Sequence, residues 1–458
     1  MSELDESLGE LGRSLAGEVI APADAEYDAA RRCFNALVDR RPAVIVRCVG
    51  TGDVATAFAF AREHELEVAV RGGGHNPAGH CVLDGGLVID LSQLRTVDID
   101  AGARIAGAGG GSTWLDFDGA SQAFGLVAPG GVVGSTGVGG LTLGGGIGHL
   151  TAQYGLTCDN LVGAEIVTPD GTEVVANADE NSELLWGLRG AGGNFGVATR
   201  LDFRLHPLDR VVGGQLTYRG QRVRDALRRF RDVALQSPRE LSCSVVLGVD
   251  AELAPWLAAF PCYTGTDGDP EELRVLRTAP GLVEDGMRSH SFVDQQRLID
   301  SAYGENRHYW KGHFVHELPD ELLDELLRRL AALGRPAGEV LIESLHGAPK
   351  EADPSTGVVG FRDAAFNVSV MAGWQDARLD EEQIEWARAT AAAIEPWSFS
   401  GGGYVNYMQA DEPIERVRAT FGAEAFGRLQ ALKRRYDPDN VLRRNQNIPP
   451  TDAGAAIR

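Results

Sequence analysis

Short apolar runs, separated by turns of glycine and aspartate, fill the chain up to about residue 210. Their β-branched residues predict strands over 44–48, 68–70, 87–90, 104–106 and 164–168. Alternating Ala and Phe predict a helix that starts at Asp53 and runs to residue 63. A Pro-Asp-Gly turn at 169–171 predicts a hairpin, and Asn181 or Ser182 is a suitable cap for the next helix. This half of the chain therefore reads as an α+β domain.

Beyond about residue 211 the pattern changes to longer amphipathic segments. Arg, Leu and Glu recur at helical spacing, which predicts helices over 223–235, 319–333 and 381–394. Apolar runs between them predict strands over 242–249, 339–344 and 365–372. These elements predict a second lobe. After a Gly-Gly-Gly run at 401–403, an aromatic and polar stretch precedes one further predicted helix.

Length and charge narrow the class of protein. A chain of 458 residues is too long for one core, which stops growing near roughly 250 residues. The formal net charge of −22, with no basic stripe, argues against a nucleic-acid partner and favours small molecules. Only three residues are lysine, which fits either a GC-rich genome or an acidic halophilic proteome.

Cysteine usage and the N-terminus predict a cytoplasmic protein. Six cysteines stand singly, without a Cys-x-x-Cys pair or the spacing of a zinc site, so we expect reduced thiols. The first residues are acidic and lack a basic stretch followed by an apolar run, so no secretion signal is expected.

Residues 119–158 contain no Asp, Glu, Lys or Arg, a length that could span a bilayer. Thirteen of these residues are glycine, and each glycine destabilises a helix by about 1 kcal/mol relative to alanine, so we expect no membrane helix here. Bare backbone of this kind suits close wrapping around a large, mostly apolar and partly anionic ligand.

The glycine-rich turns do not match the common phosphate-binding motifs. No window fits G-x-G-x-x-G, and no lysine follows a Walker A loop, so a Rossmann nicotinamide site and a P-loop are disfavoured. The strongest local signal is Arg71-Gly-Gly-Gly-His75-Asn-Pro-Ala-Gly-His80, directly after a predicted strand. Its backbone N–H groups can form a nest for a pyrophosphate. His75 and His80 lack a third partner at metal-ligand spacing, so no metal site is expected.

Six ordered motifs carry a family resemblance over about residues 44–448. They are RGGGHNPAGH, DGGLVIDLSQL, GLTLGGGIGHLTAQYGLTCDNL, LLWGLRGAGGNFGVAT, GYVNY and YDPDNVLRRNQNI. Together they resemble the berberine bridge enzyme-like branch of the vanillyl-alcohol oxidase flavoproteins. The resemblance implies an α+β fold with a two-part FAD-binding domain, and a substrate domain built on an antiparallel sheet with covering helices.

The resemblance also assigns the segments of the chain. We expect an N-terminal segment at 1–36, the first part of the FAD-binding domain at 37–210, and the substrate domain at 211–397. A C-terminal segment at 398–450 is expected to return to the FAD-binding domain, followed by a tail at 451–458.

The resemblance implies FAD bonded covalently through its 8α-methyl group to His75. The residues expected at the cofactor are Arg71, Gly72, Gly73, Gly74, His75, Asn76, Gly79, His80, Pro129, Thr136, Gly139, Gly140, Gly144, Gly145, Gly148, Asn160, Gly193, Gly196, Val197, Asn445 and Asn447. Many relatives carry a second link through a cysteine, and here that position is Val133. This departure is similar to the singly linked, hydroxynicotine oxidase-like bacterial branch. Cys158 lies in a neighbouring turn and is a candidate only for an additional contact.

The implied activity is hydride transfer to flavin from a C–H that bears a hydroxyl or an amine. Tyr407 of Tyr404-Val-Asn-Tyr407 is the implied general base, and Lys311 is a candidate helper on the substrate side. Packing of the two tyrosines on the sheet remains an alternative. Candidate pocket residues of the second lobe are Trp310, His313, Glu343, His346 and Trp374.

Three functions stay open at this point. The flavin of an oxidase is reoxidised by O2 to give H2O2, a dehydrogenase uses another electron acceptor, and a flavin-containing ligand-binding protein has no turnover. The expected partners are a small-molecule substrate and an electron acceptor, and the oligomeric state is open.

Overall fold

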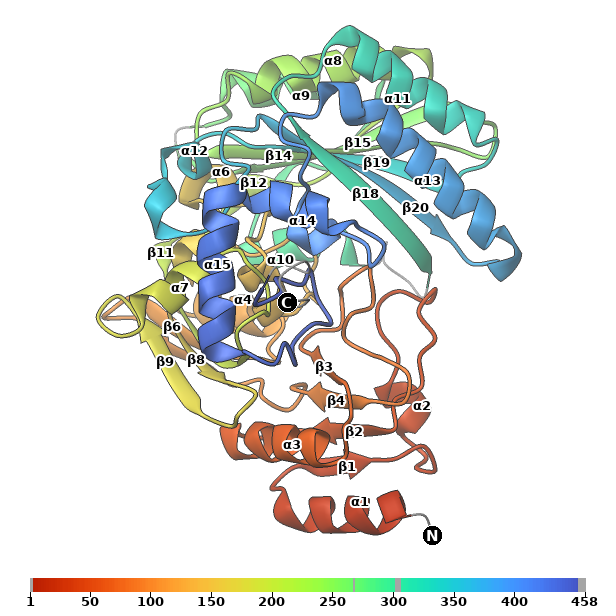
Figure 1. Ribbon diagram of the computed structural model, residues 1–458. Helices are drawn as coiled ribbons and strands as arrows, with labels where there is room; N and C mark the ends of the chain where they lie inside the picture. Colours follow the sequence, from red (N-terminus) through yellow and green to blue (C-terminus); the bar gives the residue numbers. More distant parts are fainter. Residues whose placement is uncertain (1–2, 267, 301–305, 452–458) are drawn as a thin grey trace.

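The computed structural model describes residues 3–266, 268–300 and 306–451. Two lobes are visible in Figure 1. The lower lobe contains the N-terminal half of the chain together with the C-terminal helices, and the upper lobe is a large sheet covered on its outer side by helices. The predicted tail at 451–458 lies outside the described residues except for residue 451.

The lower lobe begins with a small sheet at the bottom of Figure 1. Its strands, in spatial order, are β1 (Glu18–Ile20), β2 (Val44–Arg47), β4 (Leu87–Asp90) and β3 (Val68–Arg71). Helices α1 (Glu3–Ser14) and α3 (Thr51–Glu63) pack on one face, and α2 (Tyr27–Ala30) packs on the other. The expected N-terminal segment therefore contributes a strand to this sheet, since β1 pairs with β2.

Helix α3 begins two residues earlier than predicted. Gly50 occupies the N-cap position, and Asp53 lies inside the helix. The Asp53 carboxylate instead accepts hydrogen bonds from the backbone N–H groups of Ala16, Gly17 and Val49. Asp53 thus ties the start of α3 to the segment between α1 and β1.

A second, antiparallel sheet completes the lower lobe. Its strands, in spatial order, are β5 (Val97–Asp100), β6 (Ile105–Gly109), β10 (Val197–Arg204), β8 (Leu161–Val167) and β9 (Glu173–Asn177). The predicted turn at 169–171 joins β8 to β9, and α7 (Ser182–Leu188) begins after Asn181. Asn181 has left-handed backbone angles and makes no side-chain cap hydrogen bond. All five strands predicted in this half form, with ends shifted by up to three residues.

The uncharged stretch at 119–158 forms short elements separated by glycine turns. They are the end of α4 (Trp114–Gln122), β7 (Leu126–Val127), which pairs with β11 (His206–Pro207), α5 (Val138–Leu143), α6 (Thr151–Tyr154) and the start of a 3-10 turn (Thr157–Asn160). Within the described residues, no helix combines the length and apolar character needed to cross a membrane.

The upper lobe is built on one large antiparallel sheet. Its main path, in spatial order, is β16 (Leu282–Asp285), β13 (Leu216–Arg219), β15 (Pro255–Tyr263), β14 (Leu241–Val249), β19 (Gly338–Ser344), β20 (Phe366–Trp374) and β18 (Arg307–Val315). Beside β15 lie β12 (Val211–Gly213) and β17 (Arg288–His290). The predicted helices and strands of this lobe form with ends shifted by at most two residues.

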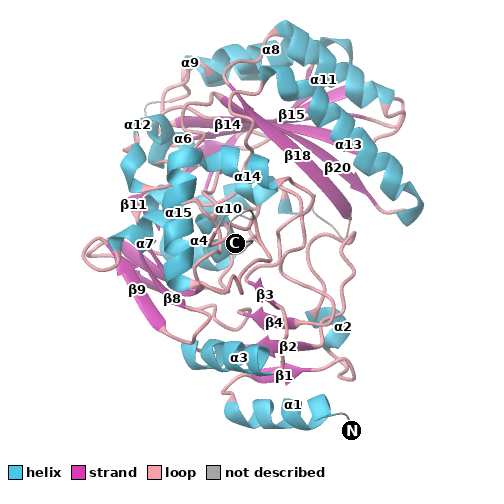
Figure 2. Ribbon diagram, viewed as in Figure 1, coloured by secondary structure: helices cyan, strands magenta, loops and turns pink. Residues whose placement is uncertain are grey.

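The outer face of this sheet is covered by four helices (Figure 2). They are α8 (Val223–Ala234), α9 (Glu271–Arg277), α11 (Asp320–Ala332) and α13 (Asp380–Ile394). The short helices α10 (Phe292–Gln296) and α12 (Ala348–Glu351) lie elsewhere in the lobe. Because successive strand residues point to opposite faces, one set of side chains fills the core under the helices. The other set faces the lower lobe, where the cavity lies.

The chain then returns to the lower lobe as two helices rather than the single helix predicted. α14 (Ile414–Phe421) ends at Gly422, and α15 (Ala423–Tyr436) starts directly after it. Gly422 has a φ of 76°, a left-handed value that breaks the helical path at little cost only for glycine. α15 packs against the same core as α7, so the C-terminal segment belongs to the lower lobe.

A buried ion pair holds the final segment in place. Lys433 and Asp437 are both fully buried, and their side chains are 2.7 Å apart. Lys433 also donates to the carbonyl oxygens of Asn194 and Leu442, at 2.9 and 2.8 Å. Asp437 accepts from the N–H groups of Val441 and Leu442. These bonds fix residues 441–446, which line the cavity described below.

We expect Lys433→Met to lower the free energy of unfolding by about 3–5 kcal/mol, because it leaves the Asp437 carboxylate buried without its partner. Urea unfolding followed by far-ultraviolet circular dichroism measures the change. Lys350→Met removes an exposed lysine and serves as the control. Equal stability of the two variants would show that the buried pair does not hold the segment.

Candidate functional site

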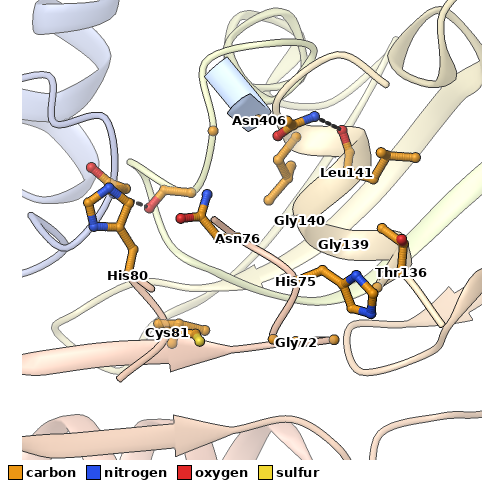
Figure 3. Close-up of a pocket in the computed structure, with 18 of the residues that line it drawn as sticks. Gly72, His75, Asn76, His80, Cys81, Thr136, Gly139, Gly140, Leu141 and Asn406 are labelled. Carbon is orange, nitrogen blue, oxygen red and sulfur yellow. Dashed lines mark hydrogen bonds between the residues drawn. The ribbon is translucent and has the colours of Figure 1, made fainter. Parts of the chain in front are cut away.

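A cavity of about 270 Å³ is lined by residues of both lobes. Figure 3 shows part of the lining that the lower lobe supplies. Four stretches of the lower lobe contribute most of its lining, at 72–81, 131–143, 192–198 and 442–446. Phe34, Trp310 and the 405–407 turn add an aromatic wall. The motifs that are far apart in the sequence therefore meet around one space.

The glycine turn after β3 forms one side of this cavity. An added Cβ at Gly73 would lie 2.4 Å from the backbone nitrogen of Gly137, and one at Gly137 would lie 2.4 Å from the nitrogen of Gly73. The two turns thus approach backbone to backbone, which only glycine permits. Gly74, with a φ of 70°, turns the chain so that His75 follows beside the cavity.

His75 is held on two sides. Its Nε2 atom lies 3.0 Å from the Ser135 hydroxyl, and its ring stacks on Phe34 with 5.0 Å between ring centres. Burial lowers the pKa of His75 to about 4, so the imidazole is neutral at physiological pH. A neutral imidazole keeps a free lone pair, as nucleophilic attachment to a cofactor requires.

Most of the residues predicted to bind the cofactor line the cavity. They are Gly72, Gly73, Gly74, His75, Asn76, His80, Thr136, Gly139, Gly140, Gly193, Gly196, Val197 and Asn445. Val133, which the resemblance places where a second flavin link would be, also lines it. Cys158 does not, because it is buried with Phe361 and Tyr404 in a separate apolar cluster.

The other predicted residues support the lining from behind. Arg71 donates to the carbonyl of Ala30, and Gly79 packs against Val38. The Asn160 side-chain amide donates hydrogen bonds to the carbonyl oxygens of Tyr154 and Leu156. The remaining ones outside the lining are Pro129, Gly144, Gly145, Gly148 and Asn447.

The lining of the cavity suits a flavin nucleotide. Added Cβ atoms at Gly140 and Gly193 would meet nothing within 4 Å, so these glycines leave space for a ligand against bare backbone. Among the described residues, four buried polar atoms of the lining lack a partner: Nε2 of His80, Nε1 of Trp310, Nε of Arg444 and Oδ1 of Asn445. Such atoms are expected where a polar ligand supplies the missing hydrogen bonds.

Tyr407 and a buried carboxyl group form a polar pair at the aromatic wall. The Tyr407 hydroxyl donates to Oε1 of Glu343 over 3.4 Å, and Asn367 Nδ2 donates to Oε2 at 2.7 Å. Burial raises the pKa of Glu343 to about 7. The Tyr407 ring packs edge-on against Trp310, with 5.4 Å between centres. A group with this pKa can accept and release a proton near neutral pH.

Tyr404 has a different environment. Its hydroxyl accepts hydrogen bonds from the backbone N–H groups of Gly146 and Ile147, and from Asn406. It does not line the cavity, and burial raises its pKa well above the usual value. Tyr404 therefore positions the 405–407 turn, and its geometry gives no support for direct proton transfer.

Lys311 does not reach this site. It follows Trp310 on β18, so the two side chains point to opposite faces of the sheet. Trp310 lines the cavity, whereas Lys311 bonds to Glu412 at 2.7 Å on the other side. The expectation of a helper on the substrate side therefore has no geometric support.

Of the pocket candidates in the second lobe, Trp310 and Glu343 face the lower lobe. Trp374 belongs to the helix-covered core, and His313 shares the face of Lys311. His346 follows β19, is not in the lining, and lies beside the backbone of Pro238 and Leu241.

Sequence reasoning missed Phe34 and Asn35. Phe34 stacks between His75 and His308, and Asn35 bonds to backbone atoms of Pro77 and His308. These residues connect the glycine turn to β18, and no motif marks them.

Comparison with known proteins supports a flavin site. A family model described as FAD binding domain matches residues 42–177, and one described as Berberine and berberine like matches residues 403–449. The (R)-6-hydroxynicotine oxidase of Paenarthrobacter nicotinovorans is 32% identical over 466 residues, covering 95% of this chain and 97% of the relative.

Solved structures of two flavoenzymes have the same fold as this chain. The 6-hydroxy-D-nicotine oxidase of Arthrobacter nicotinovorans superposes with a TM-score of 0.86 at 31% identity, over 96% of this chain and 99% of the other. The berberine bridge enzyme of Eschscholzia californica shares the fold, with a TM-score of 0.86 at 21% identity over 97% of this chain and 99% of the other. The predicted α+β architecture is confirmed. On these grounds, the chain belongs to the berberine bridge enzyme-like FAD-linked oxidoreductases.

Proposed function

We propose that the protein oxidises a small molecule by moving hydride from a C–H that bears an amine or a hydroxyl to FAD. The single observation that carries this proposal is the Tyr407–Glu343 pair at the wall of the flavin cavity. Bound FAD supplies the hydride acceptor. The protein supplies a base, an apolar wall and a fixed cofactor.

The proton path follows from the hydrogen bonds. The Tyr407 hydroxyl accepts the proton of the substrate amine or hydroxyl while it passes its own proton to Glu343. Asn367 holds the second carboxyl oxygen, so Glu343 stays aimed at Tyr407. The hydride leaves from the neighbouring carbon, and the product is an imine or a carbonyl compound.

The cofactor is proposed to be bonded through His75 alone. The hydrogen bond between the Ser135 hydroxyl and Nε2 of His75 leaves Nδ1 of His75 for the flavin. Val133 lacks a thiol, so it cannot form a second link. We propose O2 as the electron acceptor, reduced to H2O2. The name of the hydroxynicotine oxidase relative supports an oxidase, and a dehydrogenase with another acceptor is the second candidate.

We expect Tyr407→Phe to slow anaerobic flavin reduction by about 100-fold to 10,000-fold, the usual range for a lost general base. The ring contacts with Trp310 and Tyr404 are kept, so the visible flavin spectrum should not change. Stopped-flow reduction by a panel of amines, alcohols and sugars measures the rate.

Tyr154→Phe is the control, since it removes a hydroxyl that bonds to the carbonyl of Pro207 away from the cavity. If Tyr407→Phe reduces at the wild-type rate, Tyr407 is not the base. If no compound in the panel reduces the wild-type flavin, the proposal of a ligand-binding flavoprotein replaces that of an oxidase.

A further inference from the structure

The inward face of the upper sheet carries a second carboxyl group that the proton path does not use. On β19, Val340 and Ile342 belong to the helix-covered core, so Glu339, Leu341 and Glu343 point toward the lower lobe. Leu341 confirms this direction, because it clusters with Trp310 and Met371. Glu339 and Glu343 thus share one face, about 13 Å apart at roughly 3.3 Å per residue.

Glu339 is partly buried and lacks a protein partner. No described side chain donates a hydrogen bond to it, and burial alone raises its pKa. The other acids of the sheet differ, since Glu343 is held by Asn367 and Glu284 lies beside Thr217. A partly buried carboxylate is stabilised by a cation, which the protein itself does not provide here.

One tryptophan lies on each side of Glu339, two strands away. Its direct neighbours across the sheet are Gly248 on β14 and Met371 on β20. Gly248 leaves room for the indole of Trp256, since an added Cβ would lie 2.5 Å from that ring. Met371 is paired in turn with Trp310, so Glu339 and Trp310 lie two strands apart, roughly 10 Å. A carboxylate beside an indole face suits an ammonium group.

A second observation points to a ligand at the Trp310 end of this row. Trp310 is only 7% exposed and lines the cavity, yet its indole N–H has no partner among the described residues. A buried donor left without an acceptor costs about 1–3 kcal/mol, so a ligand atom is expected to accept from it.

The four strands next to Glu339 carry inward charge of one sign, whereas Arg219 of β13 lies on the same face beside Trp256 and pairs with Asp250. The inward residues of β14, β19, β20 and β18, all of them described, include two glutamates and neither Lys nor Arg. The net charge of −22 also attracts cations toward the protein as a whole. A substrate with an anionic end would meet repulsion at Glu339.

We propose that the substrate is a diamine, oxidised next to the nitrogen that lies at Tyr407 and Glu343, with its distal ammonium group bound to Glu339 between the indoles of Trp256 and Trp310. Oxidation of the diamine at the Tyr407 end is taken from the proposed function, on which this inference rests. Leu341 lies between the two carboxyl groups, and Met371 lies beside Glu339, so both would contact the apolar linker of the diamine. The distal contact sets substrate preference and takes no part in the hydride step.

The test compares three linear compounds with the same eight-carbon chain: diaminooctane, octylamine and octanediol. With wild-type protein, we expect kcat/KM for anaerobic flavin reduction to be about 10-fold to 100-fold higher for diaminooctane than for octylamine, the range of a charge-assisted contact. Glu339→Gln should remove this advantage through KM, leave kcat similar, and leave octylamine kinetics within about twofold. Glu381→Gln, which removes an exposed charge from α13 on the helix-covered side, should change nothing.

Equal kcat/KM for the two amines in wild type, or an equal loss for both in Glu339→Gln, overturns the diamine assignment. Reduction by octanediol alone also overturns it but leaves the proposed function intact. If none of the three reduces the flavin, their equilibrium binding is measured by the change in flavin absorbance. Tighter binding of diaminooctane that depends on Glu339 then supports the site while the proposed function fails, and equal binding of all three overturns the site.

Discussion

His75→Ala is expected to yield a protein whose flavin is released entirely by acid precipitation, whereas the wild-type pellet stays yellow. The reason is geometric and chemical. The imidazole is buried against the cavity, held by Ser135 and Phe34, and neutral because burial lowers its pKa to about 4. Val133, at the position expected for a second link, has no nucleophilic group. Cys81 and His80 also line the cavity, but the resemblance assigns the link to His75.

Two variants serve as controls for the covalent link. His80→Ala removes the other histidine of the same turn, and Cys158→Ala removes the nearby thiol. Both should keep acid-stable flavin, measured by absorbance of the washed pellet and by the mass of the intact polypeptide. A yellow, acid-stable His75→Ala protein would refute attachment at His75, and flavin loss in Cys158→Ala would refute a single link.

The sequence predicted the glycine turn and His75 well, because the signal is local. Three glycines and a histidine after an apolar strand define both the backbone path and the group at its end. The contact between Gly73 and Gly137 needs tertiary structure to be seen, but glycine density already indicated that backbones approach closely there.

Side chains of the substrate wall were harder to predict from the sequence. Their position depends on which face of the upper sheet each residue of a strand points to. Trp310 and Lys311 are adjacent, and alternation on β18 tells only that they face opposite sides. The choice of side is made by packing against α13 and by the ion pairs of Lys311 with Asp411 and Glu412. A lysine in an aromatic stretch was therefore assigned to the substrate side, and the structure places it on the other.

The sequence pattern indicated that Glu343 is an inward polar position on β19, but the pattern alone did not identify its partner. Val340 and Ile342 alternate with Leu341 and Glu343, so an inward polar position on β19 can be read from the pattern. Its partner Tyr407 comes from a turn 64 residues later, and only the folded chain brings them together. Phe34 and Asn35 gave no signal, because their role depends on contacts with Gly74 and His308 from distant segments.

Glu343→Gln is expected to slow flavin reduction by about 100-fold to 10,000-fold at pH 8, because glutamine keeps the contact with Asn367 but cannot take a proton from Tyr407. The pKa of Glu343 is raised to about 7 by burial. Below that pH the carboxyl group is protonated and inactive as an acceptor, and above it the group is ionised and active. The wild-type rate should therefore rise with pH up to about 7 and then level off.

The pH profile separates this role from a structural one. Glu343→Gln should reduce the flavin more slowly, and its rate should no longer rise with pH up to about 7, a rise called here the limb. A packing defect would instead lower the rate equally at every pH. Glu339→Gln is the matched control, since it lies on the same face of β19 without contacting Tyr407, and it should keep the limb. Stopped-flow reduction between pH 5 and pH 9 with one amine and one alcohol measures both variants. A Glu343→Gln protein that retains the limb near pH 7 would assign that titration to another group, and the proton would then leave Tyr407 by a different path.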